Sequence, residues 1–314
     1  MATIDGTSDS DTRTGTAGSD LIRLYNSDDT AFAGNGADSV FGGNGNDVLD
    51  GGNGNDTVNG DFGDDLLFGN DGNDRVFGGG SDSTGGGSDQ VFGGCGNDTV
   101  FGWGDNDTIW GGGGNDTLRG GNGVDEVRGD SGNDDINGWY GPDLLYGGNG
   151  NDRIAAGPTA PGVPELDQLY GGNGGDTLTG HLGGGSSVLD GGAGNDVLIG
   201  GTGGGTYMFG GGGGDTFRNG NGEDYLVLRG DGGATNTLYG FRKGQDAIEV
   251  DQVRYDGDDR PEELGLDAPG IRLQAVDGDT KITFTYKGVV QTVLRIDGYL
   301  PAQLDDTDFV FLAA

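Results

Sequence analysis

A nine-residue repeat is the feature that most constrains how this chain can fold. Residues 42–59 read GGNGNDVLD and GGNGNDTVN, with glycine at positions 1, 2 and 4, aspartate at position 6 and an aliphatic residue at position 8. The glycines permit left-handed backbone conformations and close backbone approach, which is turn chemistry. The last three residues suit a very short strand, whose middle side chain points to one face and whose neighbours point to the other.

Alternation of such turns and strands predicts an all-β fold. Two units, or 18 residues, form one flattened coil, with odd turns along one edge and even turns along the other. Stacked coils place each aspartate one rung, about 4.8 Å, from the aspartate 18 residues later in the sequence. We therefore predict a parallel β-roll of two short-strand sheets.

Position 6 divides into two series when the units are sorted by edge. The regular edge carries an aspartate without a gap: Asp20, Asp38, Asp56, Asp74, Asp98, Asp116, Asp134, Asp152, Asp176, Asp196 and Asp215. The other, which we call the decorated edge, carries Asp11, Asp29, Asp47, Asp65, Asp89, Asp107, Asp125, Asp143 and Asp167, and then fails at Ser187 and Gly205. Two insertions, at about 78–88 and 156–166, fall on the decorated edge, as do its unusual turn residues Trp103, Trp139, Tyr140 and His181.

The stacked aspartates require a counter-ion if the fold is to be stable. The net charge is −36, from 52 acidic and 16 basic residues. Two carboxylates about 5 Å apart repel by about 1–3 kcal/mol at effective dielectric constants between those of water and a protein surface. One buried aliphatic side chain per unit yields about 2 kcal/mol, whereas ordering nine residues costs on the order of 10 kcal/mol. Without metal, this glycine-rich chain is therefore expected to be disordered.

Carboxylates and turn carbonyls are all-oxygen ligands, which favour a hard cation, and a flexible site with many ligands favours Ca²⁺ over Mg²⁺. The nonapeptide matches the pattern of calcium-binding β-helix repeats in RTX proteins, so the sequence resembles the RTX (repeats-in-toxin) family over about two thirds of its length. The resemblance implies a right-handed β-roll that binds several Ca²⁺ ions between turns 18 residues apart.

The resemblance also implies which side chains bind the ions. The expected ligands are the position-6 carboxylates of the regular turns, with turn carbonyls: Asp20, Asp29, Asp38, Asp47, Asp56, Asp65, Asp74, Asp98, Asp107, Asp116, Asp125, Asp134, Asp143, Asp152, Asp176, Asp196 and Asp215. Asp89 and Asp167 adjoin the insertions and are left out of this set. We expect one regular calcium edge and one decorated edge with fewer or weaker ions.

The repeat texture changes after Leu228, and we predict two domains: the roll at 1–228 and a small C-terminal β cap at 229–314. Expected strands in the cap are Thr237–Phe241, Ala247–Val250, Ile271–Ala275, Lys281–Tyr286 and Val289–Ile296, with a hairpin at Lys287-Gly288. Residues 236–250 resemble the segment that follows the roll in serralysin-type RTX proteins. The ending DDTDFVFLAA resembles the uncleaved signal read by type I secretion systems.

Outward-facing position 9 is often aromatic. Phe32, Phe68, Phe92, Trp110, Tyr146 and Tyr170 follow even turns, and Phe41, Phe77 and Phe101 follow odd ones. One interpretation is stacking from rung to rung that covers a thin core. The alternative is a contact face for a partner, a second copy of the chain or a polysaccharide. The aromatic residues of the decorated edge carry the same two interpretations.

Several function classes are disfavoured by the composition. The acidic balance disfavours nucleic acid and anionic membranes as partners, and no segment is long enough to span a bilayer. The single cysteine, Cys95, allows no internal disulfide, and the single histidine, His181, rules out an HExxH zinc protease. No GxSxG motif is present, acidic pairs are better explained by calcium than by glycosidase chemistry, and Arg75, Asp135 and Arg153 interrupt a threonine row of the ice-binding kind.

We therefore expect a non-enzymatic, secreted bacterial protein without an N-terminal signal peptide, which folds on binding Ca²⁺ outside the cell and has a structural or interaction role. Its expected partners are calcium ions and the type I secretion machinery. Two alternatives remain open at this stage. In one the roll is an extracellular adhesion or polysaccharide-binding module that acts through its aromatic side chains, and in the other it is the carrier portion of an RTX enzyme or toxin.

Overall fold

The computed structural model of the chain describes residues 1–80, 86–159, 165–228, 234–250, 271–276, 278–286, 289–304 and 308–311. The chain divides into two compact units, Met1–Ala160 and Pro161–Ala314. The fold is an all-β parallel β-solenoid with 18 residues per coil and almost no helix, consistent with a right-handed β-roll. The predicted fold class is therefore confirmed.

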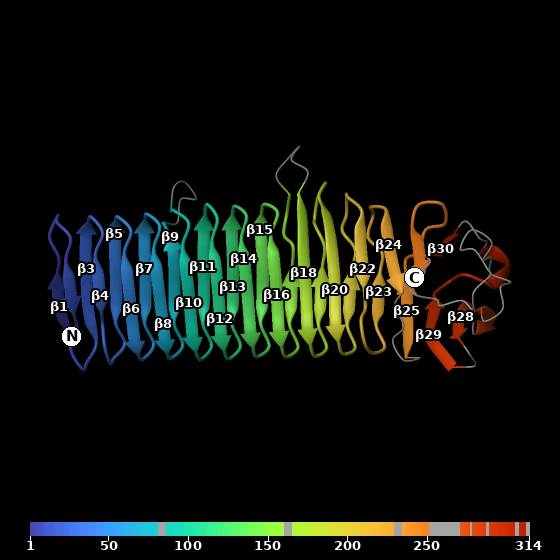
Figure 1. Ribbon diagram of the computed structural model, residues 1–314, viewed down its shortest axis with the longest axis horizontal. Coiled ribbons are helices and arrows are strands. Elements are labelled where there is room, and N and C mark those ends of the chain that lie inside the picture. The colour runs from blue at the N-terminus through green and yellow to red at the C-terminus, as the bar shows by residue number, and fades with distance from the viewer. Residues whose placement is uncertain are drawn as a thin grey trace. The chain divides into compact units, whose positions relative to one another are not determined.

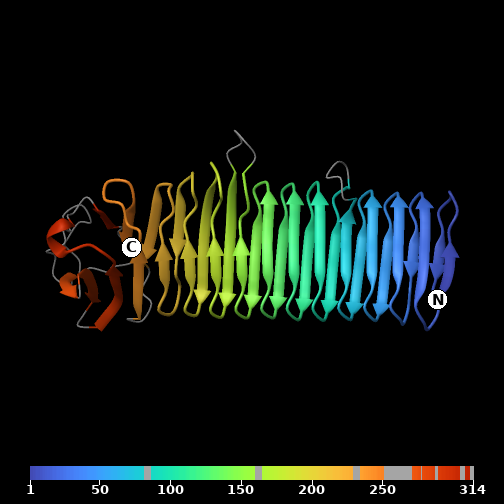
Figure 2. The same cartoon turned by 180° about the vertical axis from the view of Figure 1, so that it is seen from behind.

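In the N-terminal unit, successive strands alternate between two sheets, as the front and back views show (Figures 1 and 2). The odd sheet contains β1 (Ala2–Asp5), β3 (Asp20–Asn26), β5 (Ser39–Asn44), β7 (Thr57–Phe62), β9 (Arg75–Gly79), β11 (Thr99–Gly104), β13 (Thr117–Asn122), β15 (Asp135–Tyr140) and β17 (Arg153–Ala155). The even sheet contains β2 (Thr12–Thr14), β4 (Thr30–Phe32), β6 (Val48–Asn53), β8 (Leu66–Asp71), β10 (Gln90–Cys95), β12 (Thr108–Gly113), β14 (Glu126–Ser131) and β16 (Leu144–Asn149).

Neighbouring strands of each sheet are parallel, and their register follows the repeat. Val40, for example, pairs with Val58, 18 residues later. The first insertion does not disturb this register, because Leu66 pairs directly with Gln90 across it. A Cβ added to Gly79 would lie 2.7 Å from the Cα of Gly86, so the chain leaves and re-enters the roll at one point. The tip of the loop, 81–85, lies outside the described residues, as do 160–164 in the second insertion.

Position 8 forms the core, as predicted. The aliphatic side chains expected at this position are all fully buried: Ile22, Val40, Leu49, Val58, Leu67, Val76, Val91, Val100, Ile109, Leu118, Val127, Ile136, Leu145, Ile154, Leu169, Leu178 and Leu198. The first unit has Arg13 there instead, and its guanidinium pairs with Asp11 at 2.8 Å. Each rung thus buries one aliphatic layer, which leaves the turns to supply the rest of the stability.

The C-terminal unit has the same two-sheet construction. One sheet runs in the spatial order β19 (Thr177–Thr179), β21 (Val197–Ile199), β23 (Thr216–Arg218), β25 (Thr235–Tyr239), β29 (Val289–Ile296), β28 (Asp279–Tyr286) and β27 (Ile271–Val276). The other runs β18 (Leu166–Asn173), β20 (Ser186–Ala193), β22 (Thr206–Phe209), β24 (Asp224–Leu228), β26 (Ala247–Val250) and β30 (Phe309–Phe311). A short 3-10 turn, η2 (Pro301–Gln303), follows β29.

The parallel pairing continues past Leu228. β25 pairs in parallel with β23 and β29, and β26 with β24 and β30, before β28 and β27 add antiparallel strands. The strands expected at Ala247–Val250 and Val289–Ile296 have the observed bounds. β27 and β28 are longer than expected by one and two residues at one end, and β25 lies two residues earlier than expected at both ends. The hairpin residues Lys287-Gly288 lie outside the described residues.

Candidate metal centre in the stacked turns

The position-6 aspartates form hydrogen-bonded ladders along both edges of the N-terminal unit. The Oδ1 atom of each accepts a hydrogen bond from the backbone N–H of the aspartate one coil earlier. Asp38 N–H donates to Asp56 Oδ1 at 2.7 Å on the regular edge, and Asp29 N–H donates to Asp47 Oδ1 at 2.8 Å on the decorated edge. The ladders run from Ala2 to Asp152 and from Asp11 to Asp143, and cross the first insertion without a break.

The other carboxylate oxygen, Oδ2, is buried and accepts no hydrogen bond in most inner rungs of the part of the chain that the structure describes. These atoms belong to Asp29, Asp38, Asp47, Asp56, Asp65, Asp74, Asp89, Asp98, Asp107, Asp116, Asp125, Asp134 and Asp196. A buried carboxylate oxygen without a partner is strongly unfavourable, so each of these atoms calls for a cation or a proton.

The position-1 glycine shows what surrounds these oxygens. A Cβ added to Gly60 would lie 2.1 Å from Asp65 Oδ2 and 2.7 Å from the carbonyl oxygen of Gly78 on the next rung. At Gly129 the corresponding distances, to Asp134 Oδ2 and the Gly147 carbonyl oxygen, are 2.3 and 2.6 Å. Oxygens from two successive rungs therefore face one small space that only a glycine leaves open. Such a donor set fits a hard divalent cation, for which Ca²⁺–oxygen distances are about 2.3–2.6 Å.

Burial shifts the protonation of these carboxyls. It is the largest cause in every case and outweighs the opposing hydrogen bond from the neighbouring backbone N–H. On the regular edge it raises the pKa of Asp56, Asp74, Asp98 and Asp116 to about 6 and that of Asp134 to about 7. On the decorated edge it raises the pKa of Asp47, Asp89 and Asp125 to about 7, of Asp65 to about 8 and of Asp107 to about 9.

The N-terminal rungs differ from the inner ones. Asp20 Oδ2 accepts a hydrogen bond from Thr16 N–H at 2.6 Å and another from the Thr16 hydroxyl at 2.8 Å, while its Oδ1 accepts one from Ala2 N–H. These N–H donors lower the pKa of Asp20, and the backbone N–H of Thr7 does the same for Asp11. At the N-terminal end the protein's own N–H and O–H groups thus satisfy the carboxylate oxygens, whereas in most described inner rungs Oδ2 accepts no hydrogen bond.

The decorated edge of the C-terminal unit replaces carboxylates with hydroxyls. Strand register aligns Ser187 with Thr206, and Thr206 with Asp224. The assignment of position 6 to Gly205 is therefore wrong by one residue. Ser187 Oγ accepts a hydrogen bond from His181 N–H, and Thr206 Oγ1 accepts one from Gly201 N–H, both at 3.0 Å. These neutral side chains cap their turns without adding charge to the stack.

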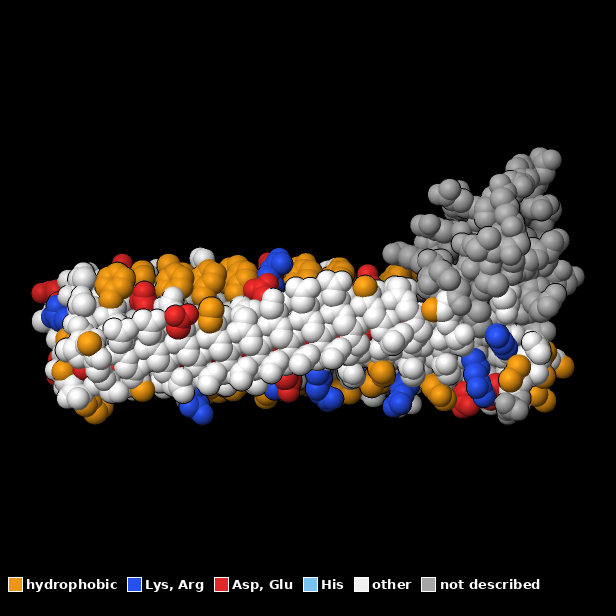
Figure 3. Space-filling view, turned by 90° about the horizontal axis from the view of Figure 1, so that it is seen from below, with side chains coloured by type: hydrophobic (Ala, Val, Ile, Leu, Met, Phe, Trp, Pro, Cys, Tyr) orange, Lys and Arg blue, Asp and Glu red, His pale blue; other side chains and the backbone are white. Residues whose placement is uncertain are grey.

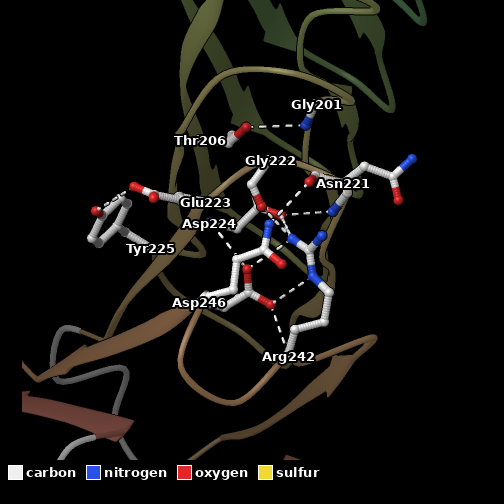
Figure 4. A network of polar contacts seen from close by, with 11 residues as sticks. Gly201, Thr206, Asn221, Gly222, Glu223, Asp224, Tyr225, Arg242 and Asp246 are labelled. Atoms are coloured by element: carbon white, nitrogen blue, oxygen red, sulfur yellow. Dashed lines mark hydrogen bonds and ion pairs between the residues drawn. The ribbon is translucent and has the colours of Figure 1, made fainter.

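Basic side chains lie beside the remaining carboxylates of this edge. The buried His181 places Nε2 2.9 Å from Asp167 Oδ2. Figure 4 shows the Arg242 guanidinium between Asp224 and Asp246, with Nη2 3.6 Å from Asp224 Oδ2 and 2.8 Å from Asp246 Oδ1. Arg242 Nη2 also donates to the Gly222 carbonyl. A carboxylate pair and a turn carbonyl around a positive group is the arrangement that the inner rungs offer to an ion.

Asp89, which was placed on the decorated edge but left out of the expected ligands, completes the decorated ladder across the insertion. Two further residues were not predicted from the sequence. Asn236 accepts the Asp215 N–H at 2.8 Å on the regular edge. Asp246 continues the decorated edge beyond Asp224. Gly244, Asp246 and Ile248 match positions 4, 6 and 8 of the repeat, which is the signal that identifies this turn in the sequence.

The outward aromatic residues of the even sheet stack from rung to rung. Phe68, Phe92 and Trp110 are parallel, with ring centroids 5.1 and 4.4 Å apart. Arg128 follows Trp110 in register and lies 4.5 Å from the ring centroid of Tyr146. Figure 3 shows hydrophobic side chains gathered in rows on both sides of a pale band of turn backbone. The covering role predicted for position 9 accounts for this row.

Among the described residues, no group of three His, Cys, Asp or Glu side chains comes together to hold a metal ion. No helix in the described part is long and apolar enough to span a membrane. The fold and its oxygen-lined turns define a parallel β-roll of the ion-binding kind. The family model for the RTX calcium-binding nonapeptide repeat matches residues 5–154 and 170–207, and the chain belongs to this family. Its repeats imply Ca²⁺ binding.

No curated protein matches the chain. Among solved structures, the extracellular lipase LipA from Serratia marcescens is similar, with 18% identity and a TM-score of 0.28. The match covers 85% of this chain and 40% of that lipase. The chain therefore spans less than half the length of the lipase, and a likeness this weak carries nothing about activity.

Gly60, at position 1, has no left-handed φ, so an alanine there adds a methyl group without the backbone strain of a positive φ. In Gly60→Ala the new methyl group meets Asp65 Oδ2 and the Gly78 carbonyl, so we expect loss of ion binding at this rung and destabilisation by about 1–3 kcal/mol. Native mass spectrometry counts the ions, and thermal unfolding in calcium measures stability. Gly113→Ala is the control, because its Cβ would meet nothing within 4 Å. Equal ion counts in both variants would contradict this role of position 1.

The raised pKa values set a pH dependence for the metal-free chain. The folded carboxyls hold protons up to about pH 6–9, whereas the unfolded ones lose them near pH 3.8. Folded stability is thus present at low pH and lost as pH rises through the folded values. In chelator, β circular dichroism should increase when pH falls from about 7.5 to about 5, and revert on return. A calcium-saturated sample should gain nothing, and a chelated chain indifferent to pH would disprove the argument.

Removal of the Arg242 charge should leave two buried carboxylates facing each other. We expect Arg242→Met to lower the free energy of unfolding by about 3–5 kcal/mol in saturating calcium. Adding Asp246→Asn should restore part of the loss by removing one charge. The exposed Arg218→Met serves as the control. Thermal unfolding of all variants measures the effect, and a double variant as unstable as Arg242→Met alone would refute the electrostatic explanation.

Proposed function

We propose that this protein is a secreted β-roll whose immediate biochemical act is to bind Ca²⁺ ions between its turns and to fold in doing so. The observation that carries the proposal is the series of buried Oδ2 atoms that accept no hydrogen bond in the described inner rungs. Carbonyl oxygens of the next rung lie near them, and the carboxylates repeat one rung apart, so the folded chain is unfavourable until positive charge enters.

The proposed ligands are the inner position-6 aspartates with carbonyl oxygens of the facing turns. On the regular edge they extend from Asp38 through Asp215. On the decorated edge they extend from Asp29 through Asp143 and include Asp89. The lower calcium content proposed for the decorated edge resides in the C-terminal unit, where Ser187, Thr206 and Arg242 replace carboxylates or ions.

Calcium is favoured over magnesium by the makeup of the site. Main-chain carbonyls must supply most ligands, and turn geometry cannot meet the strict octahedron and short bonds that Mg²⁺ demands. Weak sites in extracellular modules bind calcium at about 10⁻⁴–10⁻³ M, a level reached outside cells. The chain would therefore stay unfolded during synthesis and fold after export, a course that agrees with the acidic, thin-cored composition.

Export through a type I system is the part of the proposal that rests on the family and on the C-terminal residues. The terminal DDTDFVFLAA combines acidic residues with an apolar tail, although 305–307 and 312–314 lie outside the described residues. Export should require these C-terminal residues and should not depend on any residue of the roll. Secretion of a reporter fused to residues 229–314, compared with the same fusion lacking the last ten residues, tests this directly.

The folding proposal is tested by calcium titration of the intact chain. We expect little β signal in chelator at pH 7.5 and cooperative folding on addition of millimolar Ca²⁺, with several ions bound per chain in native mass spectra. Mg²⁺ at the same concentration should fold the chain poorly. A chain that keeps its β circular dichroism in chelator at this pH would overturn the proposal.

A further inference from the structure

A cavity of about 340 Å³ opens on the outer face of the odd sheet within the N-terminal unit. Its lining comes from three successive rungs, and most of it is aromatic: Phe101, Trp103, Arg119, Asn122, Trp139 and Tyr140, with Gly120 and Gly121 between them. The carboxylates of the ladders are buried, and the cavity adjoins a candidate metal site only at Gly120, whose added Cβ would lie 2.4 Å from Asp125 Oδ2.

Strand register explains the shape. Trp103 on β11 pairs with Gly121 on β13, and Gly121 pairs with Trp139 on β15. The two indoles therefore stand two rungs apart, about 9–10 Å along the stack, with a residue that lacks a side chain between them. Phe101 stacks on Trp103 with centroids 5.4 Å apart, and Tyr140 meets Trp139 edge to face at 6.3 Å. The result is a slot with aromatic walls and a glycine floor.

Both tryptophans adopt a backbone conformation that disfavours them. Trp103 has φ of 80° and Trp139 of 75°, at position 2 of their units, where glycine takes positive φ in most other turns. The N–H of Trp139 is held by the Asn137 side-chain oxygen at 3.0 Å. Trp139 is nevertheless 45% exposed, so neither burial nor backbone preference accounts for the residue. Strained residues of this kind cluster at ligand clamps.

The polar groups of the slot limit the charge of a ligand. Arg119 is the one charged residue in the lining, and its Nη1 lies 3.2 Å from Asp135 Oδ1 and donates to the Leu118 and Asp135 carbonyls. Its charge is therefore largely balanced within the protein. The chain as a whole carries −36, which repels anions. The remaining donors, the free guanidinium edge and the Asn122 amide, suit an uncharged hydroxylated ligand.

We propose that this slot binds a neutral saccharide, one or two pyranose rings of a longer chain. A pyranose presents C–H groups on its faces and hydroxyls around its rim, so its faces match the indole walls and its rim reaches Arg119 and Asn122. This inference rests on the proposed calcium-dependent fold, because the walls come into place only when β11, β13 and β15 stack.

The test uses the calcium-loaded full chain and isothermal titration with neutral gluco-, galacto-, manno- and xylo-hexasaccharides, with oligogalacturonate as the anionic probe. At least one neutral hexasaccharide should bind with micromolar to millimolar Kd, and oligogalacturonate should bind at least tenfold more weakly. Trp103→Ala and Trp139→Ala should each weaken binding at least tenfold. Trp110→Ala is the matched control, because Trp110 stacks on Phe92 on the other sheet.

A second pair of variants separates binding from structure. Trp103→Gly and Trp139→Gly remove the strained φ as well as the ring, so the calcium-folded chain should keep or raise its thermal midpoint while saccharide binding falls. A merely structural role for the tryptophans predicts the opposite. The proposal is overturned if no neutral probe binds below about 10 mM, if Trp110→Ala loses as much affinity as the slot variants, or if the slot variants only abolish self-association in sedimentation. Calcium titration by circular dichroism, read separately, shows whether a failure lies in folding or in recognition.

Discussion

The alignment of like charges at one rung spacing governs this molecule. A parallel coil of constant length sets every turn over the one before it, so identical side chains stack at about 4.8 Å. Hydrogen bonding satisfies one of the two oxygens of each carboxylate, because Oδ1 accepts a hydrogen bond from a backbone N–H of the adjacent rung. In most inner rungs of the described part, Oδ2 lies near a carbonyl oxygen of the next rung and accepts no hydrogen bond. In the proposed function the cation is as much a part of the structure as the aliphatic core, and folding and ion binding are one equilibrium.

The ends of the ladders show how the chain behaves where an ion is not used. At the N-terminal end, backbone and hydroxyl donors of Thr16 satisfy Asp20. In the C-terminal unit, Ser187 and Thr206 remove the charge and keep the turn hydrogen bond. Arg242 instead supplies a positive group between Asp224 and Asp246. Each device removes a deficiency that the inner rungs retain, which supports the interpretation of those rungs as ion sites.

The repeat predicted the parallel roll, the buried position 8 and the aspartate edges, because a period that strict leaves one stacking register. Prediction failed where few of the residues that define the repeat are present. In the glycine run 200–205 nothing in the sequence marks the turn boundary, and the register was placed on Gly205 instead of Thr206. Asp246 was missed because only three repeat positions survive around it. The role of Arg242 depends on a close approach between Gly222 and Asp246, which no periodicity encodes.

Stacking restricts the inward-facing side chains, so the rungs differ mainly in their outward-facing residues. The outward aromatic residues form two groups that differ in backbone conformation. Phe68, Phe92 and Trp110 lie within regular strands, where an extended backbone accommodates them and their stacking covers the core. Trp103 and Trp139 stand in left-handed turns where glycine is the favoured residue. Packing explains the first group at no conformational penalty. For the second group the penalty is of order 1–3 kcal/mol per residue, and Trp139, which is 45% exposed, regains little of it by burial. The reason for those two residues must therefore lie outside the stability of the roll, in what the slot between them contacts.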